Sequence, residues 1–184
     1  MNVRISNEIK GCAKNVISQI IRGDSDIRST LVISPPCCGK TTLVRDIARM
    51  LSNGMDEPYF RGLNVGIVDE RSEIAGCCNG VPSNDVGIRT DVLDACPKEK
   101  GIYMMLRSMA PRVIVTDEIG GPGDYVAVAS AINSGVRLIA TAHGRSIDET
   151  RARKEIGNMI DDRFFERYIV LSSSKGPGTV EKII

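Results

Sequence analysis

Residues 31–42 read LVISPPCCGKTT. The apolar run at positions 31–33 is followed by a turn that contains two prolines and two cysteines, and then by Gly39, Lys40 and Thr41. After Thr42 the apolar residues recur at helical spacing. This order predicts a strand, a phosphate-binding loop and a helix.

The chemistry of such a loop requires backbone N–H groups around a polyphosphate at the positive end of a helix. Gly39 lets the backbone approach the phosphates, Lys40 can reach the β- and γ-phosphate oxygens, and the Thr41 hydroxyl is placed to ligate Mg²⁺. The prolines carry no N–H, so the donors must come from residues 37–42. We predict a nucleotide site formed by Ser34, Pro35, Pro36, Cys37, Cys38, Gly39, Lys40, Thr41 and Thr42.

One position departs from the usual phosphate-loop pattern, G-x-x-x-x-G-K-[ST]. Ser34 stands where the first glycine is expected, which leaves the geometry of that turn open. The alternative, an ordinary helix that happens to begin with Gly-Lys-Thr, is disfavoured by the strand and helix patterns on either side.

The composition sets broad limits. The chain has 184 residues, enough for one domain with a sizeable core, and 24 basic and 23 acidic residues leave a net charge of +1. The net charge therefore gives no indication of a nucleic-acid or anionic-lipid partner. There is no apolar run of about 18 residues, so we expect a soluble, cytoplasmic protein. The six cysteines show no C-x-x-C spacing, and we expect reduced thiols.

The domain organisation follows from the order of apolar runs. Residues 1–30 contain a helix expected at 9–22, which either packs on the following domain or ends a missing amino-terminal domain. Residues 31–184 alternate between strand and helix patterns, which predicts a three-layer, mostly parallel α/β sheet ending in a β-hairpin. The strands expected after the phosphate loop are 63–68, 113–115, 136–140, 168–171 and 179–184.

The connections carry weaker signals. Residues 73–97 lack clear periodicity and are expected to form a functional or disordered loop with a short helical turn at 91–95. Helical spacing continues over 102–109. Asp124 is expected to cap a helix over 125–134, and Ser146 with Glu149 has capping-box spacing for a polar, arginine-rich helix.

Polar residues follow three of the predicted strands at one edge of the sheet. The run 69–71 follows the first, Asp117 and Glu118 follow the second, and His143 ends the third. Asp117 is the candidate ligand of Mg²⁺, and Glu118 is the candidate group that polarises the attacking water. His143 fits a γ-phosphate sensor or relay as well as it fits an ordinary packed histidine, and Thr141 is the alternative.

An arginine that completes such a site cannot be identified from spacing. We favour Arg89, because it lies within the unassigned 73–97 loop. The other candidates are Arg71, Arg107 and Arg163.

Four longer runs carry a family resemblance: PPCCGKTTLVRDIARMLS, VGIVDERSEIAGCCNG, GIRTDVLDACPKEKGIYMMLRSMAPRVIVTDEIG and GVRLIATAHG. Together they closely resemble the stage III sporulation protein AA family, which is similar to the traffic ATPases of type II and type IV secretion systems. The resemblance implies a RecA-like P-loop core. Lys40, Thr41, Asp117 and Glu118 match its nucleotide motifs, while Glu70 and His143 fall where the secretion ATPases carry acidic and histidine boxes.

The same resemblance implies an ATPase with Mg²⁺ that forms a homo-oligomeric ring, a hexamer when full length. It would associate peripherally with a membrane complex between mother cell and forespore, on the mother-cell side, and energise or gate a secretion-like channel through membrane-protein partners. The amino-terminal region of full-length members is missing, so we expect a fragment of a longer chain.

Two alternatives remain beside this motor. Because no N-K-x-D guanine signature is present, ATP is favoured over GTP as the nucleotide of this chain. A nucleic-acid-stimulated ATPase has little support, since four Tyr, three Phe and no Trp leave few stacking groups, and we expect no nucleic-acid partner. An ATP-gated assembly module with negligible hydrolysis is the alternative from another functional class.

Overall fold

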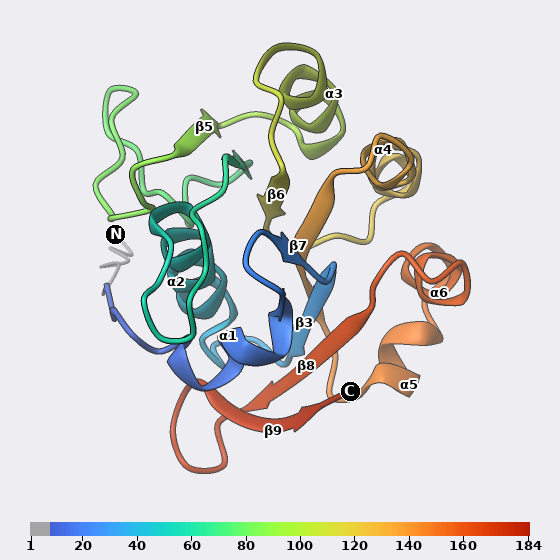
Figure 1. The fold of residues 1–184 in the computed structure, drawn as a ribbon. Helices are drawn as coiled ribbons and strands as arrows, with labels where there is room; N and C mark the ends of the chain where they lie inside the picture. The colour runs from blue at the N-terminus through green and yellow to red at the C-terminus, as the bar shows by residue number, and fades with distance from the viewer. Residues whose placement is uncertain (1–7) are drawn as a thin grey trace, which may run out of the picture.

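The computed structural model describes residues 8–184, which form a seven-stranded sheet with helices on both faces (Figure 1). The strand order is β5-β4-β6-β7-β3-β8-β9, and every neighbouring pair is parallel except β8 and β9. The strands are β3 (Thr30–Ser34), β4 (Val65–Asp69), β5 (Thr90–Asp94), β6 (Val113–Thr116), β7 (Arg137–His143), β8 (Arg167–Ser172) and β9 (Thr179–Ile183). The predicted α/β class and the carboxyl-terminal hairpin are confirmed.

The helices divide between the two faces of the sheet (Figure 1). Along β3, Val32 faces one hydrophobic cluster with α1 and α2, while Leu31 and Ile33 face the other with α3, α4 and α6. The whole of β3, β4 and β6 is buried, as expected for parallel strands covered on both sides. The helices are α1 (Lys14–Ile20), α2 (Lys40–Asn53), α3 (Lys98–Ser108), α4 (Pro122–Asn133), α5 (Ile147–Arg151) and α6 (Lys154–Asp161).

The first helix is shorter than predicted. It spans Lys14–Ile20 rather than 9–22, and the chain then forms a small antiparallel pair of strands, β1 (Ile21–Arg22) and β2 (Asp26–Ile27). Val16, Ile17 and Ile20 are buried in the same cluster as α2. The amino-terminal segment described here therefore packs on the sheet.

The predicted helical turn at 91–95 is wrong. Residues Thr90–Asp94 form the edge strand β5, paired in parallel with β4. Val92 and Leu93 contact opposite hydrophobic clusters, which is the alternation of a strand. Five residues with two aspartates are too short to show that period in the sequence.

Asp124 is not the N-cap of its helix. The cap is Gly121, Pro122 is the first helical residue, and Asp124 occupies the third position, where its carboxylate accepts the N–H groups of Gly120 and Gly121, both at 2.8 Å. The expected cap at Ser146 is confirmed, because its hydroxyl accepts the Glu149 N–H at 3.1 Å. Within the described residues no helix is long and apolar enough to cross a bilayer.

Candidate nucleotide site

The carboxyl ends of β3, β7 and β6 lie next to one another and bring three of the predicted motifs together. Ser34 and His143 are register partners at the ends of β3 and β7. Asp117 directly follows β6, which pairs with the other side of β7. The phosphate loop, the acidic pair and the histidine therefore meet at one edge of the sheet, where doubly wound sheets bind their ligands.

The phosphate loop has the backbone of an anion-binding nest. Cys37 and Gly39 both have positive φ, at 61° and 81°, and α2 begins directly afterwards at Lys40. Left-handed residues of this kind turn successive N–H groups toward one concavity, and the helix N-terminus adds its partial positive charge. Gly39 is also confined by space, because a Cβ there would lie 3.2 Å from the backbone nitrogen of Gly178 in the β8–β9 turn.

Ser34 takes part in this site despite replacing a glycine. It is buried, ends β3, and is not one of the positive-φ residues. Its hydroxyl donates to the Pro35 carbonyl at 2.7 Å and accepts from Lys40 Nζ at 3.2 Å. The turn thus needs no glycine at this position, and the serine supplies an additional acceptor for the lysine.

Lys40 is 8% exposed and points along the inside of the loop. Its ammonium donates to the carbonyl oxygens of Ser34 and Pro35, both at 3.1 Å, and to His143 Nδ1 at 2.9 Å. Burial lowers the pKa of Lys40, and the negative charge of Glu118 opposes that change. The cation is therefore held among neutral acceptors, which phosphate oxygens could replace.

The contact with Lys40 fixes the tautomer of His143. An ammonium has only donors, so Nδ1 must accept and the proton of the neutral ring lies on Nε2. His143 Nε2 lies 3.2 Å from Glu118 Oε2, and Arg71 Nη1 lies 3.6 Å from the same oxygen. Lys40, His143, Glu118 and Arg71 thus form one chain of polar contacts across the site.

Asp117 is 5% exposed, and its Oδ1 atom has no hydrogen-bond partner. Burial raises the pKa of this carboxyl, Asp69 and Glu73 raise it further, and the cations of Lys98 and Arg71 oppose the shift. A buried, unsatisfied carboxylate oxygen is costly unless a cation completes it.

These groups fit a Mg²⁺ ion of the P-loop kind. Thr41 supplies a hydroxyl in the first turn of α2, and Asp117 supplies the unsatisfied oxygen. Among residues 8–184 no three His, Cys, Asp or Glu residues are arranged to hold a metal by themselves. A nucleotide would supply further oxygen ligands from its phosphates.

Glu70 lies at the rim of the site, where it forms an ion pair with Lys98. The preceding residue, Asp69, is fully buried, and its carboxylate accepts the N–H groups of residues 73, 74 and 75 at 2.8–3.0 Å. The two carboxylates of the charged run at 69–71 therefore have different roles: Asp69 anchors the start of the following loop, and Glu70 remains half-exposed. The sequence alone did not distinguish these two carboxylates.

Arg89 is not brought to this site. Its backbone N–H donates to Ser52 Oγ at 2.7 Å and its guanidinium to the Ser52 carbonyl at 2.8 Å, near the carboxyl end of α2. This position lies at the opposite edge of the sheet, beside the start of β4. Arg107, in the last turn of α3, and Arg163, after α6, are also at that edge. Of the four arginine candidates, Arg71 contacts the site.

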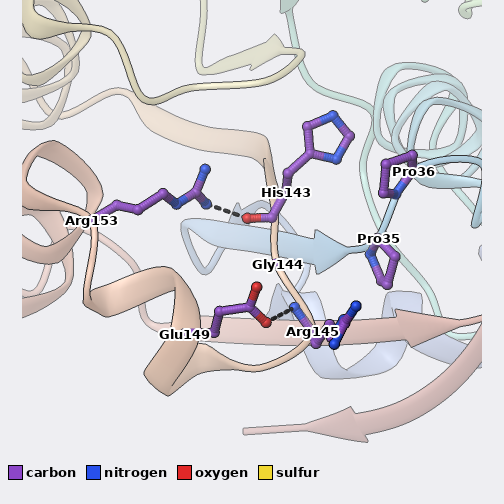
Figure 2. Close-up of a pocket in the computed structure, with 7 residues that line it drawn as sticks. All are labelled: Pro35, Pro36, His143, Gly144, Arg145, Glu149 and Arg153. Atoms are coloured by element: carbon purple, nitrogen blue, oxygen red, sulfur yellow. Dashed lines mark hydrogen bonds between the residues drawn. The ribbon is translucent and has the colours of Figure 1, made fainter.

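Two arginines that the sequence did not single out lie beside His143. A depression of about 400 Å³ next to the phosphate loop is lined by Pro35, Pro36, His143, Gly144, Arg145, Glu149 and Arg153 (Figure 2). Arg153 donates to the His143 carbonyl oxygen, and the Arg145 N–H donates to Glu149 at 2.8 Å (Figure 2). The sequence could have indicated Arg145, because it lies two residues after His143.

Comparison with known proteins places this geometry in context. The family model described as Sporulation stage III, protein AA matches residues 1–184. The stage III sporulation protein AA of Bacillus subtilis (strain 168) is 45% identical over 182 residues, which cover 99% of this chain and 58% of that protein. The chain thus spans less than two thirds of the length of this relative.

Solved structures of two ATPases share the fold. The Legionella pneumophila ATPase DotB matches with a TM-score of 0.62 at 20% identity, over 89% of this chain and 46% of that one. The VirB11 ATPase from the Brucella suis type IV secretion system matches with a TM-score of 0.61 at 14% identity, over 94% of this chain and 50% of that one. The predicted P-loop ATPase fold is therefore confirmed.

Proposed function

The chain belongs to the family of Sporulation stage III, protein AA, and we propose that it binds ATP with Mg²⁺ and hydrolyses it. The observation that carries this proposal is the contact chain from Lys40 through His143 to Glu118. It connects the lysine that would contact the γ-phosphate with the carboxylate that would act on water. A Gly-Lys-Thr sequence that merely begins a helix would not require a contact between its lysine and a carboxylate after another strand.

In the binding step, Lys40 exchanges its present acceptors for phosphate oxygens. The N–H groups of residues 37–42 would surround the phosphates, and Thr41 and Asp117 would hold Mg²⁺. When bound, Mg²⁺ would neutralise part of the phosphate charge. The predicted nucleotide and metal residues retain these roles in the proposal.

In the hydrolytic step, Glu118 orients a water molecule and accepts its proton. The water oxygen forms a bond to the γ-phosphorus, the bond from that phosphorus to the β–γ bridging oxygen breaks, and ADP and phosphate result. General-base assistance of this kind contributes on the order of 10² to 10⁴ in rate. His143 is the proposed γ-phosphate sensor, because the arriving phosphate competes for Lys40 and thereby releases Nδ1.

Thr141 is the less suitable sensor. It is 2% exposed within β7, and its carbonyl accepts the Ile119 N–H at 2.8 Å. This contact fixes the strand against the segment that follows Glu118. We therefore assign Thr141 to the support of that segment and His143 to the phosphate.

We further propose that the full-length protein works as a cytoplasmic ring, associated with a membrane complex through membrane-protein partners. Similarity in fold to a VirB11 ATPase of a type IV secretion system supports a role in energising or gating a channel during sporulation. Arg71, 63% exposed and paired with Glu118, is the proposed cis arginine. A neighbouring copy would supply any arginine finger, which contributes on the order of 10³-fold or more in rate.

The test is phosphate release from Mg²⁺-ATP over a protein concentration series, for the wild type and Lys40→Ala, with the exposed Lys154→Ala as control. Release that rises faster than linearly with concentration and disappears only in Lys40→Ala supports a ring ATPase. Release insensitive to Lys40→Ala contradicts the proposed site. Tight ATP binding without release supports an assembly module instead.

A further inference from the structure

Lys98 is a cation in an unusual place. It is the first residue of α3, and its side chain is 11% exposed. The ammonium forms an ion pair with Glu70 and lies 3.7 Å from Asp117 Oδ1, the same oxygen that lacks a hydrogen-bond partner. Sequence reasoning assigned no role to this residue.

The start of a helix does not favour a lysine. The first turn of α3 carries the positive end of the helix dipole, where an anion is favoured over a cation. The neighbouring carboxylates offset this cost, because Asp69, Glu70 and Asp117 all lie at the same sheet edge. Lys98 is therefore held by the acidic groups around it rather than by its own helix.

The fold brings α3 close enough for this contact. Gly101, one turn after Lys98, lies so close to β4 that a Cβ there would be 2.4 Å from Val68 Cγ1. Val68 immediately precedes Asp69 and Glu70. A larger residue at position 101 would push the first turn of α3, and Lys98 with it, away from the site.

We propose that Lys98 is a positioning residue that serves as the counter-ion of Asp117 in the metal-free protein and gives up this oxygen to a divalent cation. This inference rests on the assignment of Asp117 to Mg²⁺ in the proposed function. The 3.7 Å separation is an ion pair without a hydrogen bond, so the oxygen remains available. Glu70, which is 39% exposed, retains the displaced ammonium near the rim.

Two consequences follow from this competition. Removal of the Lys98 charge leaves the Asp117 charge without its nearest cation, which lowers stability without metal and raises the affinity for a divalent cation. An ordinary structural lysine would lower stability without raising metal affinity. The two roles are therefore separable by a binding measurement.

The experiment titrates Mn²⁺ alone into nucleotide-free protein and records free Mn²⁺ by electron paramagnetic resonance. Lys98→Met is expected to bind Mn²⁺ at least fivefold more tightly than the wild type. Lys98→Arg, which keeps the charge, and Lys100→Met, which removes an exposed charge of the same helix, are expected to stay within twofold of it. Unchanged or weaker binding by Lys98→Met overturns the proposal.

A second measurement uses the wild type, so it does not depend on whether Lys98→Met folds. Acetylation of Lys98 by acetic anhydride, followed by mass spectrometry, is expected to rise at least twofold when Mn²⁺ is added, while acetylation of Lys100 stays constant. Equal acetylation of Lys98 with and without Mn²⁺ contradicts displacement.

Both measurements omit nucleotide, so they separate this inference from the proposed function. A chain that shows Lys98-dependent Mn²⁺ binding but no ATP hydrolysis would retain the counter-ion role and lose the ATPase assignment. If hydrolysis depends on Lys40 and Glu118 but replacement of Lys98 does not change Mn²⁺ binding, the ATPase assignment stands and the counter-ion role fails.

Discussion

Lys40 Nζ lies 2.9 Å from His143 Nδ1, so the phosphate-loop lysine and the only histidine of the chain are direct hydrogen-bond partners. Because the other ring nitrogen faces Glu118 at 3.2 Å, a change at the lysine can reach the carboxylate through a single imidazole. This relationship links phosphate binding to the group proposed to act on water.

Replacement of His143 by alanine should therefore separate binding from hydrolysis. We expect ATP affinity within about threefold of the wild type, since Lys40 and the N–H groups of the phosphate loop are unchanged, and hydrolysis reduced roughly 10²-fold as for a lost catalytic contact. Fluorescent-nucleotide binding and phosphate release check this. Thr141→Val is the comparison variant, and a larger loss of hydrolysis there than in His143→Ala would assign the sensor to Thr141.

Cys37 should tolerate glycine better than any other replacement. Its φ of 61° is in the left-handed region, which costs a side chain about 1 kcal/mol and costs glycine almost nothing. We expect Cys37→Gly to raise the free energy of unfolding and Cys37→Val to lower it, as measured by urea denaturation. Cys78→Gly, at an exposed position without positive φ, should be neutral or destabilising. Destabilisation by Cys37→Gly would contradict the loop geometry.

The thiols should differ in their reactivity at pH 8. Burial raises the pKa of the Cys12 thiol to about 11, and the nearby charge of Asp46 contributes to this shift. Since the thiolate is the reactive form, Cys12 remains protonated and unreactive toward iodoacetamide until the pH approaches 11 or the chain unfolds. Exposed Cys37 and Cys78 should be labelled first, as detected by mass spectrometry.

Mg²⁺-ATP should then protect Cys37 but not Cys78, because only Cys37 lies in the phosphate loop. Labelling of Cys12 as fast as Cys78 would contradict its burial. Equal labelling of Cys37 with and without nucleotide would contradict the position of the nucleotide.

Asp69→Asn should loosen the loop after β4. The carboxylate accepts three N–H groups, and an amide offers a single oxygen and brings its own N–H donors. We expect a loss of about 3 kcal/mol in unfolding free energy and faster hydrogen exchange at residues 73–75. Asp91→Asn, an exposed control on β5, should change neither. Unchanged exchange in Asp69→Asn would show that other contacts order this segment.

Much of the fold was predictable from its apolar runs. β3, β4, β6, β7 and β8 contain apolar runs bounded by turn residues, so both their existence and their common carboxyl edge could be inferred. β5 was missed because an edge strand is buried on fewer sides and needs fewer apolar residues. Its two aspartates and five-residue length hide the strand period.

The site was predictable only where chemistry follows directly from local sequence. Asp117 and His143 could be placed because each comes at or directly after a strand, and Lys40 because it belongs to the phosphate-loop motif. The depth of Asp69, the remote position of Arg89 and the contact of Lys98 with Asp117 depend on tertiary packing over many residues. No local pattern encodes such distances.

The most direct test of the proposed hydrolysis is phosphate release by Glu118→Gln, compared with the wild type at matched occupancy by Mg²⁺-ATP. We expect equal ATP binding and release slowed on the order of 10²-fold or more, because glutamine cannot accept the proton of water. Glu57→Gln, at an exposed position outside the site, should match the wild type. Release by Glu118→Gln at the wild-type rate would contradict the account.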